Sequence, residues 1–366
     1  MTPPEGGGTL LQDTPPTTIC VVRLSAIGDV VHTLPLAAAL KRRWPEARLT
    51  WVAQPLPGKV LEGSPVVDEI LPFQRRRGLR SLPEYRSFRR RVADRRFDLI
   101  IVPQVAFKAG LLARLIPGPV RLGFDRRRAT DLQWAFTSHR VPPGPRGHVV
   151  DESLEFARFV GAAPERVEWP VRLSSDERSE RDRFFAEIEG PVCGILVGAS
   201  DPRKSWPPER WAPVADALEE RWGFRVALLG GPSRFEREVA DRILERARTQ
   251  PLDLLTDDLR RMMWLLDGCR LVVGPDTGPL HLAVAFGTPV VGLYGWTNPN
   301  LTGPFGPSRA YVVDGFARFP DEAYGTIREY RRDGMDRVTP RVVLAGIRKA
   351  VEDLDLTTTR KEFRDP

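Results

Sequence analysis

The sequence is poor in the residues that build metal sites and disulfide scaffolds. Its 366 residues include three cysteines, which lie far apart and form no CxxC pair. That spacing excludes a zinc ribbon, argues against a fold held together by disulfides, and favours a reducing compartment. The four histidines form no HExxH or similar ligand spacing, so we expect no metal site.

Several longer motifs are also missing. No GxGxxG follows an apolar run and no GxxxxGKS/T occurs, which disfavours nicotinamide chemistry. No apolar run approaches the roughly 20 residues that cross a bilayer, so we expect a cytoplasmic protein, either soluble or bound to a membrane surface. Residues 1–17 lack the basic and apolar regions of a signal peptide and are expected to form a disordered tail, with residues 355–366 as a polar tail.

The chain does have positive charge and enough apolar residues for a sizeable core. Its formal net charge is +7, and 42% of its residues are hydrophobic. A basic surface favours nucleic acid, anionic lipid or phosphorylated substrates as partners. We do not expect nucleic acid to bind, because no recognised nucleic-acid module accompanies the basic residues. An arginine-rich stretch from Arg75 to Arg96 is either a solvated helix face or a contact for anionic groups.

Strand-like apolar runs alternate with amphipathic helical runs, which is the pattern of a parallel α/β sheet, and the pattern occurs twice. The first half predicts strands at 18–24, 48–53, 69–73 and 98–104, with a helix at 32–44. The second half predicts strands at 191–200, 225–231, 269–278 and 289–295, with helices at 208–223, 234–247, 279–287 and 339–354. We therefore predict two doubly wound domains, 18–170 and 176–354, with a linker near 168–175.

Three loops follow predicted strands, where open parallel sheets bind their ligands. The loop in "VVGPDTGPLHLA" (272–283) leads into a helix, and we expect Pro279 at its first position with Gly278 as the cap. Free amides and a positive dipole end would then form an anion site. Thr277 and His281 could face the same ligand; alternatively, His281 is a half-buried helix residue and Asp276 only shapes the turn.

The other two loops each contain a charged residue with two interpretations. In "VGASDPRKSWPPERW" (197–211), Lys204 could contact a diphosphate or could be a solvated surface charge. In "LSAIGDVV" (24–31), Asp29 could cap a helix. An exposed aspartate is ionised at neutral pH, so Asp29 could equally act as a general base. A literal DxD at Asp353–Asp355 ends the last predicted helix and is interpreted as solvated charge.

Taken together and in this order, the loops resemble those of glycosyltransferase family 9, the lipopolysaccharide heptosyltransferases. The similar stretches are "SAIGDVVHTLP", "DPRKSWPPERW" and "GPDTGPLHLAVAFGTPVVGLYGWTNPNLTGPFG". The "HTLP" is more similar to heptosyltransferase I than to heptosyltransferase II. The resemblance implies a GT-B architecture of two Rossmann-like domains facing across a cleft. It also implies a metal-independent, inverting transfer of heptose from ADP-heptose to the Kdo of Kdo–lipid A, with no cofactor, at the cytoplasmic face of an anionic inner membrane.

The resemblance also implies roles for single residues. Asp29 matches the proposed catalytic base and Lys204 the lysine at the diphosphate. Glu236 matches a glutamate that approaches the ribose, and Ser200 a hydroxyl residue near the phosphates. The donor-binding loop is matched by Asp276, Thr277, Gly278 and His281. The expected acceptor-binding residues are Lys108, Arg126, Arg127 and Arg128.

The sequence departs from the family's pattern in the first half. Pro103–Gln104–Val105 stands where relatives often carry Asp-Gln-Gly, and Thr130 stands where they carry an arginine. These departures keep two other functions open. One is transfer of a different sugar in envelope glycan synthesis. The other is non-catalytic binding of a sugar nucleotide or nucleic acid, against which the presence of both Asp29 and Lys204 argues, because a binder needs no base.

Overall fold

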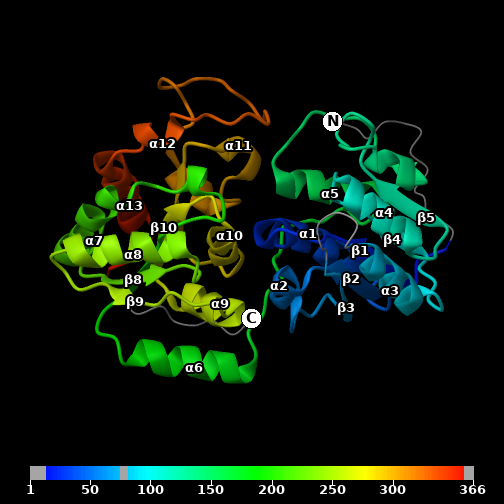
Figure 1. Ribbon diagram of the computed structural model, residues 1–366, viewed down its shortest axis with the longest axis horizontal. Helices are drawn as coiled ribbons and strands as arrows, with labels where there is room; N and C mark the ends of the chain where they lie inside the picture. Colours follow the sequence, from blue (N-terminus) through cyan, green and yellow to red (C-terminus); the bar gives the residue numbers. More distant parts are fainter. Residues whose placement is uncertain (1–13, 75–80, 358–366) are drawn as a thin grey trace. The chain divides into compact units, whose positions relative to one another are not determined.

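A computed structural model describes residues 14–74 and 81–357, and the chain divides into two compact units, 1–172 and 173–366 (Figure 1). The boundary lies inside the stretch 168–175 where the sequence analysis put the linker. Most of the two predicted tails lies outside the described residues. The same holds for the first part of the arginine-rich stretch, which contains Arg75, Arg76 and Arg77.

Unit 1 is a six-stranded sheet in the order β3-β2-β1-β4-β5-β6, and all its strand pairs are parallel. Its strands are β1 (Thr18–Val22), β2 (Arg48–Ala53), β3 (Glu69–Pro72), β4 (Leu99–Ile101), β5 (Val120–Gly123) and β6 (His139–Arg140). Its α-helices are α1 (Ile27–Arg43), α2 (Pro55–Gly58), α3 (Leu82–Val92), α4 (Phe107–Leu115) and α5 (Val149–Phe159), with 3-10 helices η1 (Lys59–Leu61) and η3 (Gln133–Phe136). Because α1 packs on α5 and α3 packs on α4, helices cover both faces of the sheet.

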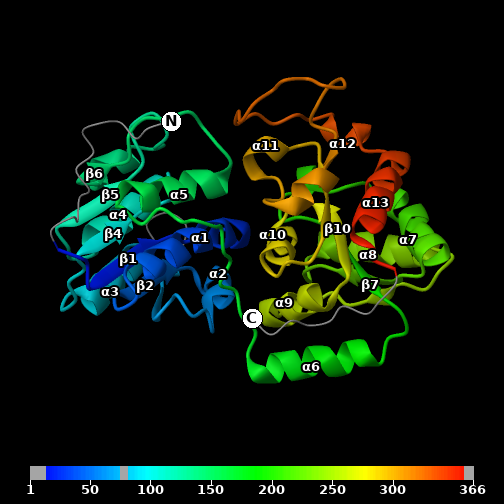
Figure 2. The same ribbon diagram turned by 180° about the vertical axis from the view of Figure 1, so that it is seen from behind.

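Unit 2, coloured from green to red in Figure 2, repeats this architecture. Its strand order is β12-β11-β10-β7-β8-β9, again with every strand pair parallel. Its strands are β7 (Val192–Leu196), β8 (Arg225–Leu229), β9 (Leu252–Asp253), β10 (Leu271–Pro275), β11 (Val290–Tyr294) and β12 (Val313–Asp314). Its helices are α6 (Ser175–Ala186), α7 (Pro208–Trp222), α8 (Arg234–Arg246), α9 (Leu259–Gly268), α10 (Gly278–Ala285), α11 (Pro299–Thr302), α12 (Gly334–Arg337) and α13 (Pro340–Leu354), with 3-10 helices η4 (Pro202–Lys204) and η5 (Pro307–Tyr311). Helices α7, α8 and α13 pack together, and α10 packs on α9.

In each unit the fourth strand in sequence pairs with the first, so the direction of winding reverses between them. The register aligns Val21 of β1 with Ile101 of β4, and Ile195 of β7 with Val273 of β10. Ligands of open α/β sheets bind beyond the carboxyl ends of the strands at such a reversal. The loops after β1 and β4, and those after β7 and β10, therefore lie where ligand sites are expected in each unit.

The predicted fold class, α/β with two Rossmann-like doubly wound domains, is confirmed by these two sheets. The predicted strands and helices correspond to structural elements, but the start of α1 differs. The helix begins at Ile27 instead of His32, so Asp29 lies in its first turn. The last helix does begin with Thr339 as N-cap and Pro340 at its first position, as expected.

All three cysteines, Cys20, Cys193 and Cys269, are buried and free. Burial raises the pKa of the Cys20 and Cys193 thiols well above the usual range, so these thiols pack as neutral apolar groups. Among the described residues, no helix combines the length and the apolar character needed to cross a membrane.

Candidate active site

Asp276 lies at the centre of the candidate donor site, at the carboxyl ends of β7 and β10, and contacts four other side chains there. It follows β10 directly and is 5% exposed. Its Oδ2 accepts hydrogen bonds from Lys204 Nζ and from Thr297 Oγ1, each at 2.7 Å. Its Oδ1 lies 3.1 Å from His281 Nε2, and Thr302 Oγ1 is 3.5 Å from Oδ2. These partners are side chains from four other places in unit 2, so Asp276 does not merely shape its own turn.

The surroundings of Asp276 determine its charge state. Burial alone would raise the pKa of its carboxyl, but the hydrogen bond with His281 and the charge of Lys204 outweigh that effect. They hold the pKa of Asp276 well below its usual range. The carboxylate is therefore ionised at neutral pH, and burial of its charge is compensated by the neighbouring ammonium and hydrogen-bond donors.

Lys204 reaches Asp276 from η4, in the loop after β7. Asp201 caps η4 by accepting a hydrogen bond from the Arg203 amide at 3.1 Å. The Lys204 side chain is 27% exposed, so it is neither buried nor a freely solvated surface charge. The neighbouring Arg203 is the more exposed residue, at 65%, and its guanidinium pairs with Asp201 at 2.7 Å. Lys204 thus combines a fixed partner with access for an anionic ligand.

The start of α10 differs from the prediction by one residue. Thr277 is the N-cap, Gly278 the first helical residue and Pro279 the second. Pro279 has no N–H, and the amides of Leu280 and His281 bond to the Thr277 carbonyl at 3.1 and 3.4 Å. Within the described part of the chain, the Gly278 N–H has no hydrogen-bond acceptor and is open to a ligand. Fewer free amides than predicted are therefore available to an anion here: the Gly278 N–H, together with the positive end of the helix dipole.

The loops after β7 and β8 also bring Glu236 and Gly198 together. Glu236 lies in the first turn of α8, where its carboxylate accepts from the Gly231 amide at 3.0 Å and from the Ser233 hydroxyl at 2.6 Å. A Cβ on Gly198 would lie 3.0 Å from Glu236 Cγ, so the glutamate packs over the end of β7. Ser200 lies two residues further along this loop and is exposed.

In unit 1, Asp29 is fixed by two partners. Its Oδ2 accepts from the Ala26 amide at 2.8 Å, and its Oδ1 pairs with Arg23 Nη2 at 2.5 Å. Ala26 is the N-cap of α1, so Asp29 supports the helix from the third position instead of being the cap itself. The Asp29 side chain is 40% exposed. Each oxygen keeps capacity for a further hydrogen bond, so the carboxylate can still receive a proton donor.

The loop after β4 adjoins that after β1 through Arg23 and Gln104. Arg23 also donates to the Pro103 carbonyl, and the Leu24 amide donates to Gln104 Oε1 at 2.9 Å. Gln104, within the stretch that departs from the family's pattern, is therefore a buried structural residue. Lys108 lies in the first turn of α4, at the same edge of the sheet as Asp29.

The three arginines after β5 have different environments. Arg127 is exposed, and the exposed Arg126 stacks on the Trp134 ring at 4.3 Å. Arg128 is buried: its side chain is 3% exposed and pairs with Asp125 and Glu155, each at 2.5 Å. It also donates to the Pro142 carbonyl at 3.0 Å. The expectation that Arg128 binds an acceptor is therefore not supported by its position, and it is left out of the proposed site.

Comparison with known proteins adds to this geometry. The profile of glycosyltransferase family 9 (heptosyltransferase) matches residues 85–327, which is more than half of the chain. The chain belongs to glycosyltransferase family 9. The family assignment confirms the resemblance found in the sequence and shows that the protein is a glycosyltransferase.

Two relatives and one solved structure illustrate the similarity. The chain is 28% identical to the lipopolysaccharide core heptosyltransferase OpsX of Haemophilus influenzae, covering 79% of this chain and 82% of that protein. It is 30% identical to lipopolysaccharide heptosyltransferase 1 of Pseudomonas aeruginosa, covering 82% and 85%. The structure of the E. coli heptosyltransferase WaaC with ADP is 23% identical, covers 91% of this chain and 99% of that chain, and has a TM-score of 0.72. That likeness supports the GT-B fold class.

Three residues of this family 9 enzyme were missed by the sequence analysis. Arg23 holds the Asp29 carboxylate, and Thr297 and Thr302 donate to Asp276. Arg23 could have been noticed, because it is a charged residue directly after an apolar strand. The two threonines lie in "GWTNPNLTGP", after β11, which is the strand beside β10. That adjacency is a property of the sheet order. The signal that could have found the two threonines is their place in the third stretch that resembles the family.

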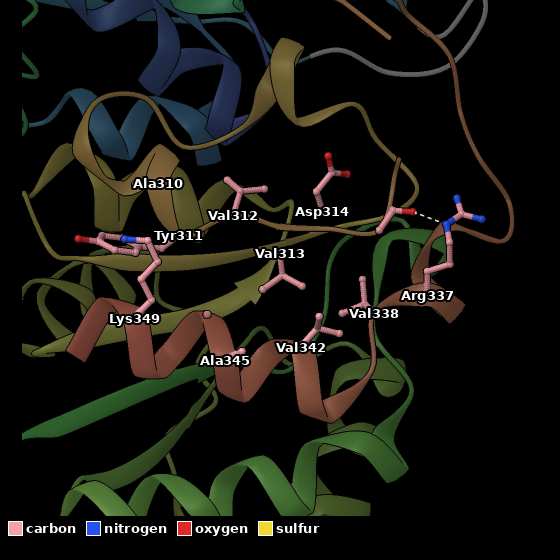
Figure 3. Close-up of a pocket in the computed structure, with 12 residues that line it drawn as sticks. Ala310, Tyr311, Val312, Val313, Asp314, Arg337, Val338, Val342, Ala345 and Lys349 are labelled. Carbon is pink, nitrogen blue, oxygen red and sulfur yellow. Dashed lines mark hydrogen bonds between the residues drawn. The ribbon is translucent and has the colours of Figure 1, made fainter. Parts of the chain in front are cut away.

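The glycosyltransferase also has a cavity of about 320 Å³ between β12 and α13 (Figure 3). Its lining includes Val313, Val338, Val342, Arg337 and Lys349. None of the predicted site residues lines it, so it is separate from the candidate donor site. In the described part of the chain, no group of three or more His, Cys, Asp or Glu side chains is arranged to hold a metal ion.

Proposed function

We propose that this glycosyltransferase moves a heptose from ADP-heptose to the Kdo sugar of Kdo–lipid A, with inversion at the anomeric carbon and without a metal ion. Membership of the heptosyltransferase family supports heptose as the transferred sugar. The names of the two bacterial relatives support lipopolysaccharide core synthesis as the setting. The ADP in the E. coli relative supports an adenine nucleotide as the donor's carrier.

In this proposal Asp29 is the general base. The acceptor hydroxyl attacks the anomeric carbon on the face opposite ADP, and the Asp29 carboxylate takes the hydroxyl proton. Arg23 and the Ala26 amide fix the orientation of Asp29 while leaving it 40% exposed. Such positioning favours a base over a simple cap, because one hydrogen bond to Ala26 would be enough to support the helix.

The observation that carries the proposal is the pair of Lys204 and Asp276 beside the start of α10. As the bond between the anomeric carbon and the diphosphate oxygen breaks, ADP gains negative charge. The Lys204 ammonium, the Gly278 N–H and the positive end of α10 can stabilise that charge without a metal. Asp276 holds Lys204 in place until the donor binds.

The order of the strands suggests how the donor is oriented along the edge of the sheet in unit 2. Glu236 follows β8, Lys204 follows β7 and Asp276 follows β10, and these strands are neighbours in the order β8-β7-β10. We assign Glu236 to the ribose, Lys204 and Ser200 to the diphosphate, and Thr277, Gly278 and His281 of the α10 loop to the phosphate nearer the sugar. The ionised Asp276 takes part in donor binding by holding Lys204. Lys108, Arg126 and Arg127 in unit 1 are assigned to the acceptor's anionic groups. The reaction would take place at the cytoplasmic face of the inner membrane, where a lipid-linked acceptor is presented.

The test is an assay of ADP release by the purified protein, with a panel of nucleotide sugars, with and without Kdo–lipid A. We expect release only with ADP-heptose and acceptor together, and no change when EDTA is added. Asp29→Asn is the matched variant, because its amide oxygen still accepts from Ala26 although the side chain cannot take the proton and loses its pairing with Arg23. It should lower turnover by roughly 10²–10⁴ and leave ADP-heptose binding nearly unchanged.

Three results would contradict parts of the proposal. Preference for another nucleotide sugar would change the donor. Loss of activity in EDTA that magnesium restores would overturn the metal-free step. If Asp29→Asn keeps more than half of the activity while Asp29→Ala loses it, Asp29 serves only the start of α1.

A further inference from the structure

An aromatic stack lies beside Asp276 at the end of β11. Trp296 is 7% exposed and contacts two side chains: the Arg203 guanidinium lies over its ring, 4.5 Å from the ring centre, and Tyr330 stacks on it. The Trp296 and Tyr330 rings are stacked, with centroids 5.4 Å apart and an interplanar angle of 23°. Tyr330 is 64% exposed. One face of the Tyr330 ring is therefore covered by Trp296, while much of the residue remains open to solvent.

The backbone fixes this stack to the candidate donor site. Thr297, whose hydroxyl donates to Asp276, forms an antiparallel bridge with Tyr330. The Arg331 amide donates to the Trp296 carbonyl at 3.2 Å. Tyr330 is thus linked to Asp276 through Thr297, by one backbone bridge and one side-chain hydrogen bond.

The loop that carries Tyr330 connects β12 to α12 and extends from unit 2 (orange in Figures 1 and 2). The Arg331 side chain is 5% exposed and pairs with Glu322 through two hydrogen bonds of 2.7 and 2.9 Å. Asn298 Nδ2 donates to the carbonyls of Gly325 and Ile327 at 2.9 and 3.0 Å. The exposed tyrosine is therefore held by an organised loop, so little conformational entropy remains to be lost when a ligand covers it.

The strand order places the stack on one side of the diphosphate position. The sequence of neighbours is β8-β7-β10-β11, with Glu236 after β8, Lys204 after β7, Asp276 after β10 and Trp296 after β11. If the ribose lies toward Glu236, the diphosphate reaches Lys204 and Asp276. The group attached to its far end then lies toward β11, where Trp296 and Tyr330 are.

We propose that the exposed ring of Tyr330, backed by Trp296 and Arg203, is a stacking platform for the transferred sugar of the donor. The ligand class is a pyranose ring, whose C–H face buries apolar area against an aromatic ring while its hydroxyls stay hydrated. Two hydrogen bonds to Asp201, at 2.9 and 2.7 Å, hold the Arg203 guanidinium over the Trp296 ring. This inference rests on the proposed direction of the donor.

The test compares ADP with ADP-heptose in calorimetric binding to the wild type and to Tyr330→Ala. We expect the variant to bind ADP-heptose about fivefold more weakly, as for the loss of one aromatic contact, and to bind ADP unchanged. Tyr330→Phe should restore the affinity because it keeps the ring. Phe319→Ala is the matched control, since Phe319 lies in the same loop and is 61% exposed. It should change neither affinity.

The outcomes separate this inference from the proposed function. A wild type that binds ADP but gains nothing from the heptose would overturn both the heptose donor and the platform. If the wild type prefers ADP-heptose but Tyr330→Ala keeps that preference, only the platform is wrong. Equal weakening of ADP and ADP-heptose would make Tyr330 a nucleobase contact. A change confined to the KM for Kdo–lipid A would make it an acceptor contact; either result overturns the inference.

Discussion

At the scale of single residues, one buried carboxylate organises the candidate donor site. Asp276 has almost no contact with water, yet its two oxygens meet an ammonium, an imidazole nitrogen and two hydroxyls. A buried charge is tolerated when it is paired and hydrogen-bonded, and removal of one partner leaves the others uncompensated. The network is therefore stable as a whole and sensitive to the loss of any single member.

The lowered pKa of Asp276 predicts how its contribution depends on pH. A carboxyl whose pKa is lower in the folded than in the unfolded chain stabilises the fold above its unfolded pKa, about 3.9. That contribution is lost as the pH falls through the folded value. We expect Asp276→Asn to lower the free energy of unfolding at pH 7 by about 3 kcal/mol, because Lys204 loses its buried partner. The difference from the wild type, measured by urea unfolding, should shrink between pH 4 and about 2.

Asp241→Asn is the control for this pH profile. Asp241 is exposed on α8 and pairs with Arg237 at 2.9 Å, and exposed ion pairs contribute little to stability. The control should unfold like the wild type at every pH. If the Asp276→Asn difference stays constant down to the lowest pH, the network does not depend on the charge of Asp276.

At the scale of helices and strands, the sequence analysis predicted the long apolar strands and the helices α1, α7, α8, α10 and α13. It left out the helices α3, α4, α5, α6 and α9 and the shortest strands. Strands β7, β10 and β11 are apolar runs that are fully buried, so their composition alone identifies them. Strands β6, β9 and β12 have two residues each, which is too short for any periodic pattern. Each of them forms because its backbone pairs with the unpaired edge of a neighbouring strand at the end of the sheet.

The candidate site was predicted in its loops but not in its contacts. Asp29, Lys204 and Asp276 were found because ligands of open parallel sheets bind at the loops that follow the strands. The partner of Lys204 is 72 residues away, and the burial of Arg128 depends on Glu155 across 27 residues. Such pairings are set by tertiary packing, and no spacing rule along the chain contains them.

One close backbone contact joins β11 to α12 and yields a prediction for Gly295. A Cβ on Gly295 would lie 2.3 Å from the Met335 amide nitrogen and 2.4 Å from the Gly334 carbonyl carbon. Backbone atoms at this distance cannot move aside as a flexible side chain could. We expect Gly295→Ala to lower the free energy of unfolding by about 1–3 kcal/mol, as overpacking does. Because Trp296 is the next residue, the affinity for ADP-heptose should fall as well.

Gly144→Ala is the matched control, since a Cβ at Gly144 would meet no atom within 4 Å. Its stability in urea should stay within about 0.5 kcal/mol of the wild type, and its donor affinity should be unchanged. Equal stabilities of Gly295→Ala and the control would show that α12 can shift away from β11 without cost.

At the scale of the whole molecule, the two units have equivalent strand orders, and the residues of the proposed reaction are distributed between them. The proposed base, Asp29, belongs to unit 1, and the residues proposed to stabilise the leaving group belong to unit 2. The arginines of α3 take no part in that chemistry. In a strand–helix–strand crossover the helix runs back against the strands, so Arg89 and Arg90 in its last turn lie at the amino edge of the sheet. Asp29 and Lys108 lie at the opposite, carboxyl edge.

The exposed arginines of α3 should therefore affect membrane binding and not catalysis. Arg86, Arg89, Arg90 and Arg91 are all exposed, but the Arg91 guanidinium is engaged by the Pro72 carbonyl, to which it donates at 2.7 Å. Near an anionic bilayer each exposed arginine contributes about 1 kcal/mol, screened over roughly 8 Å at physiological salt. Changing Arg86, Arg89 and Arg90 to Gln should weaken binding to vesicles that contain anionic lipid, and the effect should shrink as salt rises. The KM for ADP-heptose should stay the same.

A control with the same change in net charge shows whether position matters. Arg234, Arg242 and Arg246 on α8 are at least half exposed, and their replacement by Gln also removes three positive charges. If α3 faces the bilayer, the α8 variant should bind vesicles more tightly than the α3 variant at low salt. Equal weakening by both would mean that only the net charge of +7 attracts the protein to the membrane. No weakening by either would leave the α3 arginines as a solvated helix face, whose positive charge merely complements the carboxyl end of the helix dipole.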